Sequence, residues 1–275
     1  MNASDAYCRQ KAAPPGSNLY YALLMTPPAR RAAACALHAL CQEIAEVKDE
    51  VHEPSVASAK LAWWRTEIAA LCAGRPTHPA SKALLPHLEN TGISQSALLQ
   101  LVDGAEMDFE QMRYLDLPAL DRYCRLNGGQ PASLAAHLYG FSDAQTPSRA
   151  EALGQAMALA RIVANVGAEA RRGYIYFPVD ELQRFDVTAA AIQNGGYSGQ
   201  FKSLMRHQTQ RAREQLQAAQ AALPLADRRR QRALLVLAQL HLALLDEIEL
   251  SQFEILHQRI DLTPLRKLWI AWRTR

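Results

Sequence analysis

Apolar residues recur at helical spacing along almost the whole chain, and the residues that break helices fall between those stretches. Alanine and leucine dominate nearly every segment, whereas the 13 glycines and 14 prolines gather mostly in the connections. Alanine and leucine favour helices, and apolar residues three or four positions apart are typical of amphipathic helices. The pattern therefore predicts an all-α protein, and its 49% hydrophobic content is enough to bury a sizeable core.

Turn and capping residues place the helix boundaries. Thr26–Pro28 precedes the first long helix, Ser94 is placed to cap another, and the turns at Gly74–Pro76 and Asn194–Gly196 separate further ones. No repeat, low-complexity tract or long linker divides the chain, so residues 1–275 are predicted to form a single domain, one large helical bundle. The predicted helices cover residues 29–50, 56–73, 79–89, 94–112, 117–139, 148–172, 199–222, 227–257 and 262–273.

Charge and cysteine content exclude several functional classes. The 30 Lys and Arg residues against 27 Asp and Glu leave a formal charge of +3, so no basic field indicates a nucleic-acid partner. The five cysteines contain no C-x-x-C pair, which argues against a disulfide framework or zinc site and favours the reducing cytoplasm. No signal-peptide core and no long uncharged apolar run occur, so neither export nor a membrane span is expected.

Two short aromatic segments leave structural alternatives open. Residues 172–180, bounded by Gly and Pro, form either an extended piece or, as we predict, an ordered loop. The basic, Trp-rich segment Leu265–Arg275 either lies on an anionic membrane surface or docks on the bundle. Trp63, Trp64 and the two C-terminal tryptophans are expected to anchor helix packing, with the lining of a cavity as their functional alternative.

Two helical stripes are the candidates for function, because the common catalytic signatures are missing. The sequence has no G-x-S-x-G, H-E-x-x-H, Walker or G-x-G-x-x-G motif. On the helix predicted at 29–50, one face carries His38, Gln42, Ala45 and Asp49. The nearly opposite face, which we expect to be solvated, carries Glu43, Glu46 and Glu50.

The second stripe lies on the helix predicted at 148–172, in an otherwise apolar run. It carries Arg161, Asn165, Ala168, Glu169 and Arg172. An arginine in such surroundings either forms a structural ion pair, extends its head to water, or binds an anion. The sequence leaves these readings of Arg161 open.

A series of short motifs resembles a known family. The chain resembles squalene/phytoene synthases, most closely the bacterial presqualene diphosphate synthases. That resemblance implies a helical bundle of the isoprenoid synthase type around a central apolar cavity, with Tyr20 and Tyr21 in contact with substrate. The motifs that carry it are Tyr20–Ala22, Pro28–Arg31, Trp64–Glu67, Gly74–Pro79, Asp103–Asp108, Tyr114–Asp116, Tyr123–Cys124, Arg171–Gly173, Ile175–Pro178, Asp180–Leu182, Phe253 and Pro264–Trp269.

The chain departs from this family at the positions that hold metal. Family members bind two allylic diphosphates through Mg²⁺ on two Asp-x-x-x-Asp motifs, which match Ala45 and Asp49 and then Asn165 and Glu169 here. A further asparagine ligand matches Arg161. Asp49, Asn165 and Glu169 remain as oxygen donors, and a guanidinium beside a divalent cation is repelled, so we expect Mg²⁺ to be weakly held or lost.

Substrate-binding positions depart as well. The family's tyrosine and arginine before the first motif match His38 and Gln42, and a later Tyr-Arg pair matches His241 and Leu242. One alternative to loss of anion binding is that arginines replace the metals as bidentate ligands of the diphosphate. The candidates for this role are Arg161, Arg171 and Arg172.

Three functional hypotheses follow from the resemblance. We favour a catalytically impaired or silent member that binds an isoprenoid or other apolar lipid or assists a protein assembly. We expect it in the cytoplasm, and a peripheral position at the inner membrane face stays open. This hypothesis requires no cofactor. The alternative is an active farnesyl-diphosphate farnesyltransferase, alone or with an intact paralogue. That enzyme condenses two farnesyl diphosphates to presqualene diphosphate or squalene with Mg²⁺ and, for squalene, NADPH. A third hypothesis is altered chemistry on a prenyl diphosphate.

Overall fold

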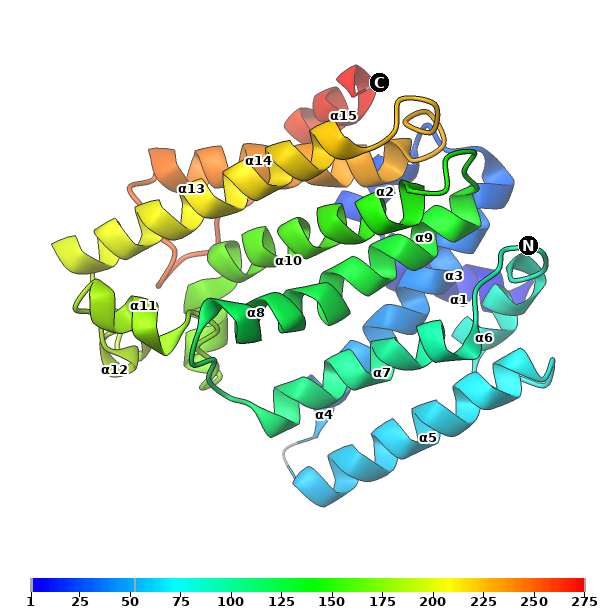
Figure 1. The fold of residues 1–275 in the computed structure, drawn as a ribbon, viewed down its shortest axis with the longest axis horizontal. Coiled ribbons are helices and arrows are strands. Elements are labelled where there is room, and N and C mark those ends of the chain that lie inside the picture. Colours follow the sequence, from blue (N-terminus) through cyan, green and yellow to red (C-terminus); the bar gives the residue numbers. More distant parts are fainter. Residues whose placement is uncertain (1, 52, 275) are drawn as a thin grey trace.

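Helices make up the regular structure of the computed structural model, which describes residues 2–51 and 53–274 (Figure 1). Within these ranges no strand forms, and a single bridge pairs Arg113 with Ile175. The all-α prediction is therefore confirmed. The helices are α1 (Ala3–Ala12), α2 (Asn18–Leu23), α3 (Pro28–Ala45), α4 (Val47–Glu50), α5 (Pro54–Cys72), α6 (Pro79–Leu84), η1 (Leu85–His87), α7 (Gln95–Glu110), α8 (Leu117–Cys124), η2 (Arg125–Gly129), α9 (Gln130–Tyr139), α10 (Thr146–Arg171), α11 (Val179–Arg184), α12 (Ala189–Gln193), α13 (Gly199–Ala222), α14 (Arg232–Leu250) and α15 (Pro264–Arg273).

Two predicted helices need corrected bounds. The helix predicted at 29–50 is interrupted at Glu46, so α4 is a separate short turn. The helix predicted at 227–257 is shorter at both ends, and beyond α14 the chain turns through Gln252 and Phe253 at φ of 58° and 64°, a conformation that ends a helix. The apolar repeat did not predict α1, α2, α11 and α12, because they are too short to show it.

The acidic face of α3 is partly covered by α1 and is not simply solvated as predicted. Lys11 Nζ lies 3.0 Å from a Glu43 carboxylate oxygen and also contacts Glu46, and the Tyr7 hydroxyl donates to Glu43. Only the outermost carboxylate, Glu50, remains largely exposed, where it pairs with Lys60. The prediction was wrong because the sequence analysis did not predict α1, which covers this face.

One hydrophobic core extends through the bundle from α1 to α15, and α10 passes through its centre. Figure 1 shows α10 running beside α13 and α14, with α5 and α7 along the opposite edge. The π-helical turn η2 approaches α10 very closely: a Cβ added at Gly128 would lie 2.4 Å from the Gly154 carbonyl oxygen. These two glycines thus allow a close contact beside the cavity described below.

The predicted loop at 172–180 is confirmed up to Pro178, and Val179 begins α11. Among the tryptophans, Trp64 is a buried packing anchor, and Trp63 packs edge-to-face on it while 46% exposed. Trp269 and Trp272 are exposed, so for these two the packing prediction is wrong. All five cysteines are free. None of the helices in the described ranges has both the length and the apolar character needed to cross a bilayer.

Candidate ligand-binding cavity

A cavity of about 590 Å³ lies between α3, α10 and α14. Its volume is in the usual range for a small-molecule site. Helix α3 contributes His38, Gln42 and Ala45, and α10 contributes Arg161 and Asn165 from across the space. Residues of the two candidate stripes therefore face each other across this cavity.

The third wall comes from α14, through side chains at positions i, i+3, i+7 and i+10 of one helix face: Leu234, Leu237, His241 and Leu244. One end of the cavity is lined by Asn18 and Leu19 of α2, by residues 259–261, and by Lys267 of α15. No Phe, Tyr or Trp side chain in the described residues lines it, so cavity lining, the alternative role of the tryptophans, is not observed. The cavity is therefore mostly apolar along α14 apart from His241, and along α3 and α10 its polar groups stand among small apolar residues.

Arg161 presents a fixed positive charge to this space. Its side chain is accessible from the cavity, and no described residue forms a hydrogen bond or ion pair with it. Burial lowers its pKa, but Tyr123, Tyr176 and Asp108 nearby outweigh that effect, so the pKa is raised overall. The guanidinium is therefore charged at every accessible pH and has no partner of its own.

Two histidines face the same cavity without hydrogen-bond partners. His38 Nε2 and His241 Nδ1 are both buried and both unpaired. Burial lowers the pKa of each to about 4, and for His241 the charge of Arg161 acts in the same direction. Both rings are therefore neutral near pH 7. Each ring therefore keeps a hydrogen-bonding nitrogen that the protein does not use, at a residue that lines the cavity.

The remaining carboxylates of the family motifs, Asp49 and Glu169, do not line the cavity and are held by cations. Arg172 pairs with Asp49 and lies 3.6 Å from Glu169. Lys48 Nζ lies 3.8 Å from the same Glu169 oxygen. Arg172 is thus committed to an ion pair within the protein.

A buried polar cluster, not predicted from the sequence, adjoins these residues. We call it the Asp108 cluster, and it consists of Asp108, Lys48, Tyr123 and Tyr176. The Tyr176 and Tyr123 hydroxyls donate to Asp108 Oδ1 at 2.6 and 3.1 Å, and Lys48 Nζ donates to the Tyr176 oxygen at 3.0 Å and lies 3.6 Å from Asp108 Oδ2. Asp108, Tyr123 and Tyr176 belong to motifs of the resemblance, but nothing in the sequence indicated Lys48.

Three other predicted substrate contacts lie outside the cavity lining. Tyr21 is buried in the core, and Tyr20 packs edge-to-face on it at 5.3 Å between ring centroids. Arg171 donates to the Leu256 carbonyl at 2.5 Å. A substrate contact for these three residues stays a prediction.

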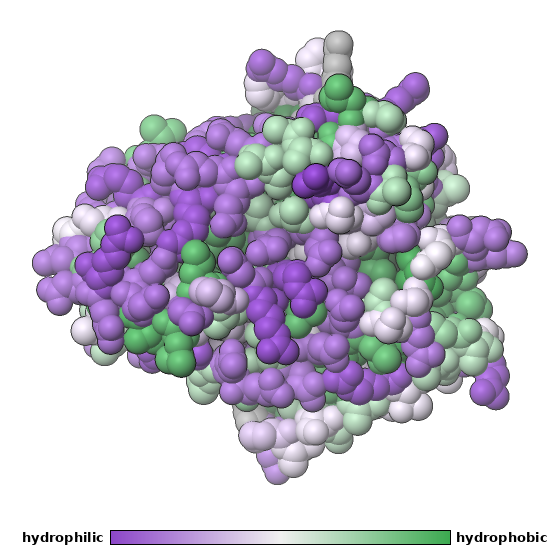
Figure 2. Space-filling model, in the orientation of Figure 1, coloured by the Kyte–Doolittle hydropathy of each residue, from purple (hydrophilic) through white to green (hydrophobic). Residues whose placement is uncertain are grey.

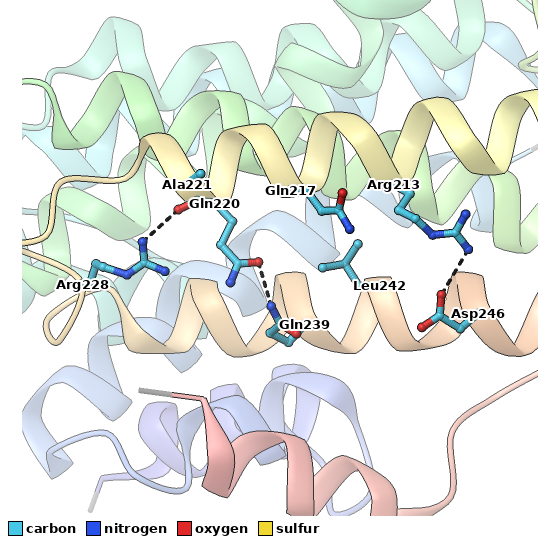
Figure 3. A pocket seen from close by; sticks show the side chains of 8 residues that line it. All are labelled: Arg213, Gln217, Gln220, Ala221, Arg228, Gln239, Leu242 and Asp246. Carbon is cyan, nitrogen blue, oxygen red and sulfur yellow. Dashed lines mark hydrogen bonds and ion pairs between the residues drawn. The ribbon is translucent and has the colours of Figure 1, made fainter.

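A second hollow, of about 670 Å³, lies between α13 and α14 (Figure 3). Its polar side chains bind one another: Gln239 donates to Gln220 at 2.9 Å, and Arg213 to Asp246 at 3.1 Å. Because its hydrogen-bonding groups are already satisfied, this hollow is a weaker candidate than the cavity beside Arg161. Among the described residues, no three or more His, Cys, Asp or Glu side chains are grouped so that they could hold a metal ion.

Comparison with known proteins adds a family and a fold. The family model described as squalene/phytoene synthase matches residues 12–266. The 15-cis-phytoene synthase of Synechocystis is 27% identical, with 98% of this chain and 86% of that protein aligned, and the phytoene synthase of Arthrospira platensis is 28% identical, with 96% and 91% aligned.

Solved structures share the helical fold. A dehydrosqualene synthase crystallised with a ligand superimposes with a TM-score of 0.89 at 19% identity, covering 98% of this chain and 95% of that one. A squalene synthase from Alicyclobacillus acidocaldarius does so with a TM-score of 0.78 at 20% identity, covering 91% and 94%. At these identities the likeness concerns the fold alone.

Proposed function

Because the chain belongs to the squalene/phytoene synthase family, we propose that its cavity binds one prenyl diphosphate, or a similar lipid with an anionic head, through Arg161 and without Mg²⁺. We further propose that it does not condense two such molecules. The head group lies between α3 and α10, and the apolar tail lies along Leu234, Leu237 and Leu244 of α14.

The observation that carries this proposal is the unpartnered guanidinium of Arg161 inside the cavity. The side chain of Arg161 is exposed to the cavity and makes no ion pair, and a planar guanidinium matches the oxygens of a phosphate through two parallel hydrogen bonds. The unpaired nitrogens of His38 and His241 add hydrogen-bonding capacity beside it. A diphosphate would therefore satisfy groups that the folded protein leaves unsatisfied.

The residues at the family's metal positions do not fit Mg²⁺. This ion requires oxygen ligands in near-octahedral geometry. Ala45 offers a methyl group, and the carboxylates of Asp49 and Glu169 face Arg172 and Lys48. Since a cation already stands beside each remaining carboxylate, we derive no step through a metal.

Cavity size supports a single ligand. A volume of about 590 Å³ falls within the usual range for one drug-sized molecule, whereas head-to-head condensation requires two prenyl chains at once. Calorimetric titration with farnesyl diphosphate should therefore give a stoichiometry of one.

Thermal unfolding in EDTA tests the binding mode. Farnesyl diphosphate at a hundredfold excess over its Kd should stabilise the protein by about 2.7 kcal/mol. Arg161→Met should abolish this stabilisation, whereas Arg149→Met, on the exposed surface of the same helix, should retain it. Farnesol carries only the apolar tail and pyrophosphate only the anionic head. Testing them separately therefore shows how much of the stabilisation comes from each part of the ligand. Stabilisation that requires Mg²⁺, or that survives in Arg161→Met, would contradict the proposal.

Active head-to-head prenyl transfer is the second candidate, and the names of the relatives favour it, since both aligned proteins are phytoene synthases. Incubation with farnesyl diphosphate, Mg²⁺ and NADPH, followed by extraction for presqualene diphosphate and squalene, decides between the two. Strong turnover by the unmodified chain would overturn our proposal. Under our proposal, the combined change Ala45→Asp, Arg161→Asn and Asn165→Asp should shift ligand binding toward dependence on Mg²⁺.

A further inference from the structure

The C-terminal helix α15 presents an apolar stripe to solvent. Its opposite face is packed on the bundle through Lys267, Ile270 and Ala271, which are buried. Four large side chains at positions i, i+3, i+4 and i+7 share the outer face and are 43% to 79% exposed: Leu265, Leu268, Trp269 and Trp272. Since isolated exposed apolar residues are common but aligned ones are not, this stripe requires an explanation.

The charge of α15 is entirely positive. Residues 264–273 contain no Asp or Glu and carry three cations. Arg266 pairs with Glu247 and the buried Lys267 pairs with Asp261, whereas Arg273 has no carboxylate partner among the described residues. The Arg273 guanidinium lies 5.0 Å from the ring centroid of Trp269, so a cation sits at the edge of the apolar stripe. Basic residues beside tryptophans on a helix face are typical of helices that lie in a membrane interface.

The loop between α13 and α14 lies next to this helix. Arg232, at the start of α14, donates to the carbonyls of Ala271 and Trp272 at 3.1 and 3.3 Å, so the loop lies next to the end of α15. Figure 1 shows both at the same end of the molecule. The loop exposes 83% of Leu225 and also exposes Arg229, which has no side-chain partner among the described residues. Elsewhere the visible face is largely hydrophilic, with apolar residues in separate patches (Figure 2).

We propose that this surface, consisting of the α15 stripe, Leu225, Arg229 and Arg273, docks on an anionic lipid bilayer. The tryptophans and leucines would enter the interface, and the arginines would meet the headgroup phosphates. A second copy of the chain fits less well, because a twofold contact through this face would bring the arginines of both copies together. With ten residues, α15 lies on the membrane and does not span it.

The docked surface is connected to the cavity through α15 itself. Lys267, on the buried face of the helix, lines the end of the cavity, together with residues 259–261 immediately before the helix. Docking would therefore hold that end of the cavity next to the bilayer. The docking inference rests on the exposed surface alone and stands or falls independently of the ligand.

Vesicle co-sedimentation of the full chain tests the apolar part. We expect the protein to bind vesicles of phosphatidylcholine with phosphatidylglycerol. Replacing Trp269→Ser and Trp272→Ser together should reduce the partition coefficient at least about tenfold. Trp63→Ser is the matched control, since Trp63 is 46% exposed on α5, and it should leave binding unchanged. Equal binding by the double variant would overturn the proposal.

Two further experiments test the electrostatic part of the proposal and the alternative that the surface binds a second copy of the chain. Arg229→Glu and Arg273→Glu should each weaken binding about fivefold or more, whereas Arg75→Glu, in an exposed turn, should not. Binding as strong to pure phosphatidylcholine vesicles would overturn the electrostatic part. Size-exclusion chromatography without vesicles should show that the tryptophan variants leave the oligomeric state unchanged. A dimer that these variants dissociate would assign the stripe to a second copy of the chain and overturn membrane docking.

Discussion

The cavity and the Asp108 cluster lie side by side in the bundle, yet they treat buried polar groups in opposite ways. In the cluster, the carboxylate of Asp108 accepts two tyrosine hydroxyls and faces the ammonium of Lys48. In the cavity, Arg161 has no partner among the described residues, and one ring nitrogen each of His38 and His241 is buried without a hydrogen bond.

This difference separates a structural role from a binding role. A satisfied polar cluster offsets the desolvation of its members and holds the helices in one arrangement. Unsatisfied groups in a cavity reduce stability, and they are compatible with the fold only because the rest of the core stabilises it. The cluster should therefore respond to mutation through stability, and the cavity through ligand binding.

The largest expected effect is at the cluster. Asp108→Ala removes the acceptor of two buried hydroxyls and the nearer of the two carboxylates beside Lys48, which should lower the free energy of unfolding by about 4 kcal/mol. Urea denaturation measures this change. Asp103→Ala, on the exposed part of the same helix, breaks only a surface ion pair with Arg65 and should cost less than about 1 kcal/mol. Similar losses for both variants would show that the cluster is not structurally important.

The next effect is the pH dependence of the cavity. Because the folded-state pKa values of His38 and His241 are lowered from 6.5 to about 4, the unfolded chain binds their protons more readily. Their neutral state is fully compatible with folding above pH 6.5, and stability is lost as the pH falls toward 4. Between pH 7 and pH 5 each histidine should contribute a loss of about 2 kcal/mol.

Variants assign this pH dependence to the cavity. The combined change His38→Gln and His241→Gln should flatten the stability profile between pH 7 and pH 5, as measured by thermal unfolding at fixed buffer strength. His87→Gln, outside the cavity lining, should leave the slope unchanged. An unchanged slope in the cavity variant would mean that other groups cause the loss.

The smallest expected effect is at Arg161. Because its charge is exposed to the cavity and makes no ion pair, Arg161→Met should change the free energy of unfolding without ligand by less than about 1 kcal/mol. Urea denaturation in ligand-free buffer checks this value. A large destabilisation would place Arg161 with the cluster as a structural residue, and it would remove the contrast between the two regions.

Local sequence was sufficient for the long helices and for the residues that share one of their faces. Helix propensity and residue spacing are local properties, so the faces that carry His38, Gln42, Arg161 and Asn165 were predicted correctly. The break at Glu46 was not predicted. It displaces the following turn, so that Asp49 pairs with Arg172 and does not line the cavity.

By itself, the sequence determined that the chain is helical, where most helices lie, which family it resembles, and that a methyl group and a guanidinium stand where that family holds metal. Only the tertiary structure decided which charges are paired. Arg172 meets Asp49 across 123 residues, and Lys48 meets Tyr176 across 128. Pairing at such separations depends on how helices pack, whereas the spacing rules that reveal a helix extend over only a few residues. For the same reason, only the packed structure distinguishes Arg161, left without a partner in the cavity, from the other arginines.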